Sequence, residues 1–250
     1  KYLSMKAFKS ICLITVVLIL AGCPKEITNP FDGADADTWM PANFTCTQQG
    51  ETLHLTWTQE ETNIEGFQIK RKVDGSNWSN VATPDKSSKS WTDNDLVAGK
   101  LHEYELRAYA GENTSDAVFA EATPVFAATI TTSTPTNITC SEATMGGEIT
   151  DNGGGTVSEL GVVYATTENP TTEDSKVEME ATEKSFSQTV TDLSAAATYY
   201  IRAYVVNTVG TEYGQQVTLT TPGLPVLSTA EPQNVTRSEA TLGGNVTNDG

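Results

Sequence analysis

One segment of this chain occurs twice, and the repetition limits the possible fold more than any other feature. Residues 135–153 and 232–250 align without a gap at an offset of 97 residues, and eleven of the nineteen aligned positions are identical. A match of this length indicates tandem modules of one fold, each about 100 residues long. Residues 41–46 and 135–140 share Pro, Asn, Thr and Cys at the same spacing, which adds a related module before the other two.

Within the modules, apolar residues alternate with polar ones. Leu53, Leu55 and Trp57 are separated by single polar residues, and the same period of two recurs over 67–71 and 102–108. This period is typical of β-strands with one buried face, whereas no helical periodicity follows the first twenty residues. We therefore predict an all-β chain. The expected modules cover 41–124 and 125–222, and a third module begins over 223–250.

Two stretches carry a more specific pattern. Leu96, Gly99 and His102 are spaced like the Leu-x-Pro-Gly-x-x-Tyr corner of fibronectin type III domains, with histidine in place of tyrosine, and Leu193 lies six residues before Tyr199 as in the same corner. The chain therefore resembles tandem fibronectin type III domains, which implies immunoglobulin-like β-sandwiches. The resemblance gives His102 a structural role, because a ring nitrogen can bind a backbone group of the loop.

The chain begins with a pattern typical of exported proteins. From Met5, the expected start, lysines precede an apolar run over residues 11–20, which is too short for the ~20 residues of a membrane-spanning helix. The run leads into the tetrad Leu20, Ala21, Gly22 and Cys23. This tetrad resembles the lipobox of bacterial lipoproteins, which implies a signal peptide over 1–22 and lipid on Cys23. An ordinary cleaved signal peptide or a short buried helix is the alternative.

Two further resemblances concern location. Residues 23–40 are expected to hold the lipidated cysteine and an acidic tether, and the Lys25-Glu26 pair resembles the export signal of Bacteroidota-type lipoproteins. Residues 199–214 are similar to fibronectin-type repeats in surface lipoproteins of that group. Together they imply a protein that is held by lipid in the outer membrane and exposed on the cell surface. Several acyl chains on the N-terminus would make the membrane a stable partner.

Composition and residue spacing exclude other functions. The net charge of −17 repels phosphate backbones, which argues against nucleic-acid binding. The two histidines have no metal-site spacing and no catalytic arrangement is recognisable, so we predict no metal, no cofactor and no enzyme within these residues. Cys46 and Cys140 fall in different modules, too far apart for a disulfide, and are expected as free thiols.

Five residues are candidates for a contact surface. Alternation along 199–204 points Tyr200, Arg202 and Tyr204 outward, where two tyrosines around an arginine could contact a glycan or another surface protein. Cross-strand pairing that stiffens the sheet is the alternative. Trp78 and Trp91 could form a pair for sugar stacking, or each could pack over the edge of the sandwich.

The leading functional hypothesis is a non-catalytic, surface-anchored lipoprotein. Its modules would serve as a stalk, or spacer, for a distal domain beyond residue 250, because apolar residues of the third repeat such as Leu242 and Val246 would otherwise lack a core. A glycan-binding protein or adhesin that uses exposed aromatic residues is the first alternative. The second alternative is the accessory region of a secreted hydrolase.

Overall fold

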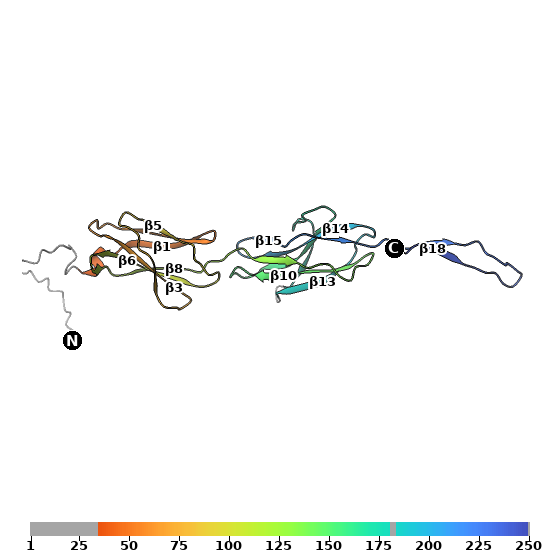
Figure 1. Ribbon diagram of the computed structural model, residues 1–250, viewed down its shortest axis with the longest axis horizontal. Coiled ribbons are helices and arrows are strands. Elements are labelled where there is room, and N and C mark those ends of the chain that lie inside the picture. Colours follow the sequence, from red (N-terminus) through yellow and green to blue (C-terminus); the bar gives the residue numbers. More distant parts are fainter. Residues whose placement is uncertain (1–34, 181–183, 250) are drawn as a thin grey trace, which may run out of the picture.

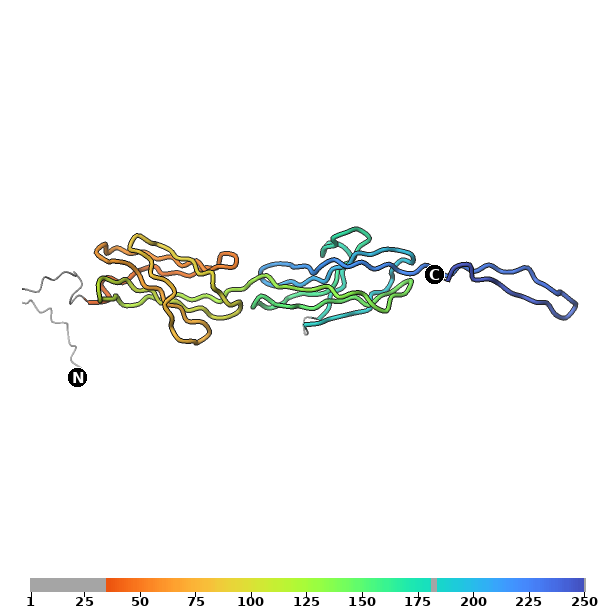
Figure 2. The backbone as a smooth tube through the Cα atoms, in the orientation of Figure 1, coloured from red at the N-terminus to blue at the C-terminus, as the bar shows by residue number. Residues whose placement is uncertain are grey.

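The computed structural model describes residues 35–180 and 184–249. Within these ranges the chain forms two β-sandwiches and a β-hairpin, which follow one another in a line (Figures 1 and 2). The hairpin lies at the opposite end of the molecule from the start of the first sandwich (Figure 1). The molecule is therefore elongated, and the chain runs along its length module by module.

The first sandwich packs two antiparallel sheets. One sheet contains β1 (Ala42–Gln49), β2 (Thr52–Thr58) and β5 (Ser90–Asp93), in that order. The other contains β4 (Ser79–Ala82), β3 (Gly66–Val73), β6 (His102–Ala110) and β7 (Asn113–Thr114), with β8 (Val118–Ala122) also paired with β6.

The predicted alternation sets the core of the first sandwich. Leu53, Leu55 and Trp57 of β2 are buried, and the Trp57 ring meets the Phe67 ring of β3 edge to face with centroids 5.2 Å apart. The short 3-10 helix η1 (Ala36–Trp39) adds Trp39, which is buried in the same core. The acidic tether predicted over 23–40 is therefore wrong for its last residues, because burial of the indole ties them to the sandwich.

The second sandwich repeats this topology. Its first sheet has the order β13 (Ser185–Val190), β10 (Ala143–Asp151) and β9 (Thr129–Thr132). Its second sheet has the order β12 (Ser175–Met179), β11 (Glu159–Ala165), β14 (Thr198–Val206) and β15 (Thr211–Tyr213), with β16 (Val217–Thr220) also paired with β14. The predicted all-β fold of tandem fibronectin type III-like sandwiches is confirmed.

The two predicted corners have the same geometry. In the first sandwich the Val97 N–H donates to His102 Nε2 at 3.3 Å, and in the second the Ser194 N–H donates to the Tyr199 hydroxyl oxygen at 2.9 Å. His102 Nδ1 lies 2.8 Å from the Lys100 carbonyl oxygen, so Nδ1 carries the proton and Nε2 accepts. The structural role predicted for His102 is confirmed.

The hairpin at the far end copies part of the second sandwich. It consists of β17 (Val226–Thr229) and β18 (Gly244–Asn248), and Gln233 bridges to Thr241 as Thr136 bridges to Thr144 at the offset of 97 residues.

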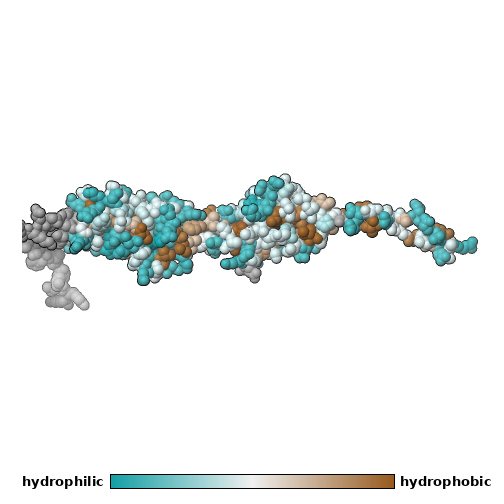
Figure 3. All heavy atoms as spheres, viewed as in Figure 1, coloured by the Kyte–Doolittle hydropathy of each residue, from teal (hydrophilic) through white to brown (hydrophobic). Residues whose placement is uncertain are grey.

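The core positions of the hairpin are open to solvent. Leu227 is 73% exposed, whereas its counterpart Ile130 in β9 is 9% exposed, and apolar side chains are visible on the hairpin surface in Figure 3. Leu242 and Val246 are likewise exposed. Among residues 35–180 and 184–249, no second sheet covers these positions of the hairpin.

Candidate functional site

The first sandwich displays two large aromatic side chains on the outer face of one sheet. Trp78 directly precedes β4 and Phe119 lies on β8, with β3 and β6 between these two strands. Their ring centroids are nevertheless 6.1 Å apart with an angle of 50° between the ring planes, so the side chains reach toward each other over the sheet. Trp78 is 38% exposed and Phe119 is 62% exposed. We call this pair the aromatic face.

Ion pairs surround the aromatic face. Lys72 Nζ lies 5.1 Å from the centre of the Trp78 ring and 2.7 Å from a carboxylate oxygen of Glu103. In the neighbouring row Glu105 accepts a 2.7 Å hydrogen bond from Arg107 Nε and lies 3.6 Å from Lys70 Nζ. Each of these three cations thus lies within ion-pair distance of a carboxylate, and Lys70 and Arg107 share that of Glu105.

Trp91 does not join Trp78. It lies on β5, pairs in register with Leu55 and packs against the core of the first sandwich, where it is partly buried. The two tryptophans therefore do not form the sugar-stacking pair that was one of the two alternatives. Trp91 fits the packing alternative, and Phe119 takes the place beside Trp78.

The contact surface predicted on β14 of the second sandwich is partly buried. Tyr204 points out of the sandwich as predicted but is fully buried, because its ring lies over Gly161 of the adjacent strand and its hydroxyl donates to Glu159 Oε1 at 2.7 Å. Hydrogen bonds from Tyr204 and Lys176 lower the pKa of the Glu159 carboxyl. Tyr204 is therefore not available as a contact residue.

Arg202 is held within its own sheet. Its guanidinium carbon lies 4.6 Å from the centre of the Tyr213 ring on β15, and its Nε donates to the Gly214 carbonyl oxygen at 3.1 Å. The Tyr213 hydroxyl in turn accepts a hydrogen bond from the Thr172 N–H at 3.0 Å. Of the three predicted residues on β14, Tyr200 remains a half-buried surface residue. This arrangement favours the alternative in which the side chains stiffen the sheet.

The first residues of the linker between the sandwiches are hydrogen-bonded to the first sandwich. The Gln48 side chain makes two bonds to the backbone of Val125: its Nε2 donates to the carbonyl oxygen at 2.6 Å, and its Oε1 accepts from the N–H at 3.0 Å. The Gly99 N–H donates to the Pro124 carbonyl oxygen at 2.8 Å. Consecutive linker residues are therefore fixed to β1 and to the loop between β5 and β6 of the first sandwich.

The next linker residue is bound by the second sandwich. The Phe126 N–H donates to the Gly153 carbonyl oxygen at 2.8 Å, and Asn207 Nδ2 donates to the Phe126 carbonyl oxygen at 2.8 Å. The amide of Asn207 is buried and also bonds the Asn152 carbonyl oxygen, at 3.2 Å. The linker thus has no free residue between the two sets of bonds.

Two glycines bring the sandwiches into backbone contact. Gly99 and Gly154 have φ angles of +69° and +74°, which favour glycine, and a Cβ on Gly99 would lie 2.7 Å from the Cα of Gly154. A Cβ on Gly154 would meet the backbone nitrogen of Gly99 even more closely. We call these glycines and the residues that bind the linker the junction.

The remaining predicted features have different outcomes. The lipobox residues and Cys23 lie outside the described residues. Cys46 and Cys140 are free thiols as predicted, and burial, followed by the charge of Asp93, raises the pKa of Cys46 to about 11. Within residues 35–180 and 184–249 no group of His, Cys, Asp and Glu side chains is placed to hold a metal ion. No helix among the residues described is long and apolar enough to cross a membrane.

The sequence patterns did not single out Phe119 or Gln48, and they did not indicate that Asn207 binds the linker. Phe119 lies between Val118 and Ala120, whose side chains face inward, so the period of two over β8 could have placed it outside. For Gln48 the sequence holds no comparable signal, because its partner lies 77 residues away. Asn207 belongs to the repeat pattern of residues 199–214, but that pattern does not reveal its partner Phe126, 81 residues away.

Comparisons with known proteins show similarity of fold only. No model of a known protein family and no curated protein matches the chain. A two-domain fibronectin type III segment of chicken tenascin matches 73% of this chain and 99% of its own, with 18% identity and a TM-score of 0.44. The FN1–FN3 domains of chicken CNTN1 match 73% of this chain and 64% of theirs, with 14% identity and a TM-score of 0.33.

Proposed function

We propose that this chain is a non-catalytic spacer whose sandwiches hold a distal part of the protein away from a membrane. The observation that carries the proposal is the junction, where Pro124 and Val125 are bonded to the first sandwich and the next residue, Phe126, is bonded to the second. A spacer must keep its length, and hydrogen bonds on both sides of a linker restrict the domain rotations that flexible linkers permit. The in-line arrangement in Figure 2 supports the same role.

In this proposal the membrane anchor is lipid on Cys23. The tetrad of residues 20–23 would direct cleavage and lipidation, and the chain would then leave the outer membrane at the η1 end of the first sandwich. The net charge of −17 supports an exposed position, because a strongly acidic surface stays soluble and is repelled by anionic lipid headgroups. The sandwiches would therefore stand away from the bilayer.

The junction can be tested by the relative orientation of the two sandwiches. Residual dipolar couplings of the purified chain should fit one alignment tensor for both sandwiches. Gln48→Ala removes both bonds to Val125 and should require separate tensors, whereas Gln49→Ala, the neighbouring exposed glutamine on β1, should leave one. Independent tensors in the unmodified chain would refute the spacer role.

The anchor is tested separately. A fatty-acid analogue supplied to cells that express the chain should label the protein, and Cys23→Ser should abolish the label. Label on the Cys23→Ser variant would refute lipidation at this residue, and the spacer role of the junction would still stand on the dipolar couplings.

A further inference from the structure

We propose that the aromatic face of the first sandwich, formed by Trp78 and Phe119, binds a neutral polysaccharide. This activity goes beyond the spacer function and does not depend on it. The aromatic face is on the outer side of a sheet, and the junction is at the end of the sandwich, so the two can act independently.

Both rings of the aromatic face are exposed to solvent. Phe119 is 62% exposed while its strand neighbours Val118 and Ala122 pack against the core, so its ring contributes nothing to the interior. Trp78 instead packs against Phe119 and Lys72. Two large apolar rings that meet on an otherwise polar sheet face mark a contact site.

The size of the aromatic face argues against a protein partner. A stable protein–protein interface buries about 800 Å² on each side. A whole aromatic side chain can bury roughly 150–250 Å², of which Trp78 and Phe119 expose only a part, and the groups around them are ion pairs that would have to lose water. A sugar ring covers one aromatic side chain, so the aromatic face fits a chain of sugars better than a second protein.

Charge argues for a neutral ligand. Lys72 is paired with Glu103 at 2.7 Å and Arg107 with Glu105 at 2.7 Å, so neither cation is free to pair with an acidic sugar. The whole chain carries −17 charges, which repels polyanions at long range. Sugar hydroxyls can instead donate to the carboxylates of Glu103, whose side chain is 27% exposed, and of the exposed Glu121.

The ring geometry narrows the ligand class. The 50° angle between the Trp78 and Phe119 planes prevents one flat ribbon of sugars from lying on both rings. A polymer whose successive rings turn relative to each other can place one C–H face on each. We therefore expect amylose to bind more tightly than the straight chain of cellohexaose.

The test is affinity electrophoresis of the full chain in gels that contain amylose, with cellohexaose as a soluble competitor and polygalacturonate as the acidic control polymer. Amylose should retard the chain, and polygalacturonate should not. Phe119→Ala should weaken the retardation about tenfold, which corresponds to ~1.4 kcal/mol. Because Phe119 is exposed, its removal should leave the melting temperature unchanged.

Tyr200→Ala is the matched control, since it removes a partly exposed aromatic ring from the corresponding sheet of the second sandwich. It should bind amylose like the unmodified chain. The proposal is overturned if amylose does not retard the chain, if polygalacturonate retards it equally, or if Phe119→Ala binds unchanged. A shift of the unmodified chain to a dimer that Phe119→Ala abolishes, without amylose binding, would assign the aromatic face to a second copy instead.

Discussion

The two sandwiches share a topology, but one region of the interior holds a hydrogen-bonded ion pair in the first sandwich and apolar side chains in the second. In the first, Asp93 is buried on β5 and accepts a 2.8 Å hydrogen bond from Arg71 and a 2.7 Å hydrogen bond from the Tyr104 hydroxyl. Asp93 also accepts from the Asp95 N–H at 3.0 Å. Burial, and then the bond to Asp93, hold the pKa of Tyr104 well above its ordinary value, so the hydroxyl keeps its proton and donates.

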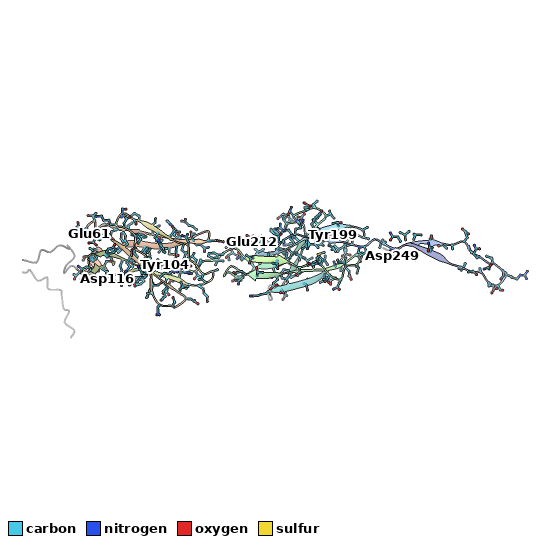
Figure 4. The ribbon with its side chains drawn as sticks, in the orientation of Figure 1. Glu61, Tyr104, Asp116, Tyr199, Glu212 and Asp249 are labelled. Carbon is cyan, nitrogen blue, oxygen red and sulfur yellow. The ribbon has the colours of Figure 1, made fainter. Side chains whose placement is uncertain are left out.

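The second sandwich has apolar side chains at these places. Val190 and Ile201 lie 97 residues after Asp93 and Tyr104, and both are buried. Tyr164 pairs in register with Ile201 as Arg71 pairs with Tyr104, and its ring meets Tyr199 with centroids 6.1 Å apart. Figure 4 labels Tyr104 in the first sandwich and Tyr199 in the second.

The difference teaches that this fold does not need the buried ion pair. Well-packed apolar groups of similar volume are often as stabilising as a buried pair, whereas removing one partner leaves an uncompensated charge. The first sandwich should therefore depend strongly on single residues, and the second should not.

The largest effect is expected for Asp93→Ala. The change leaves the Arg71 guanidinium and the Tyr104 hydroxyl without their buried acceptor and should cost the first sandwich about 3–5 kcal/mol. Calorimetry of the full chain should show its transition at lower temperature while that of the second sandwich stays in place. Val190→Ala is the matched change in the second sandwich. A smaller loss for Asp93→Ala than for Val190→Ala would contradict the contrast.

A triple replacement should convert the first interior into the second. Arg71→Tyr, Asp93→Val and Tyr104→Ile together introduce the apolar set, and the first sandwich should keep its stability or gain about 1–4 kcal/mol. Urea unfolding monitored in each sandwich measures the change. If the triple variant is as unstable as Asp93→Ala alone, the buried pair is required by the surrounding packing.

Acid should weaken the first sandwich through Asp95. A hydrogen bond from Arg71 and then the Arg71 charge lower the pKa of this carboxyl in the folded state. Stability from Asp95 is therefore present above the ordinary aspartate pKa and is lost as pH falls through the lowered value. Melting temperatures between pH 7 and pH 3 should fall less steeply for the first sandwich of Asp95→Asn. An unchanged slope would exclude this carboxyl as a source of acid sensitivity.

The smallest effect is expected for the rates at which Cys46 and Cys140, which occupy equivalent repeat positions, react with a thiol reagent. Because the pKa of Cys46 is raised to about 11, little of its thiol is ionised at pH 8, and a disulfide reagent should modify it slowly. Mass spectrometry should find Cys140 modified first, and urea should equalise the rates. Asp93→Ala should speed the reaction of Cys46, since it removes a charge that opposes ionisation. Equal rates in the folded chain would contradict the assigned cause.

The sequence predicted those features of the structure whose residues lie close together in the chain. The spacing of Leu193 and Tyr199 predicted the corner, because the loop between them is short and its backbone groups need a partner close by. The sequence left two roles open for Trp78 and Trp91, because sequence spacing does not show which sheet face each ring reaches. The sequence did not reveal that Tyr204 is buried, because its burial depends on Gly161 of another strand, where the missing side chain leaves room for the tyrosine ring.

The sequence by itself determined the modular all-β fold, its repeat and the inward faces of its strands, since the pleat of a β-strand turns a period of two directly into two faces. Only the tertiary structure decided that Trp78 meets Phe119, that Gln48 binds Val125, and that the core positions of the hairpin are exposed. These features join segments that lie far apart in the chain. Their contacts are set by how sheets and modules pack, which no local pattern of residues specifies.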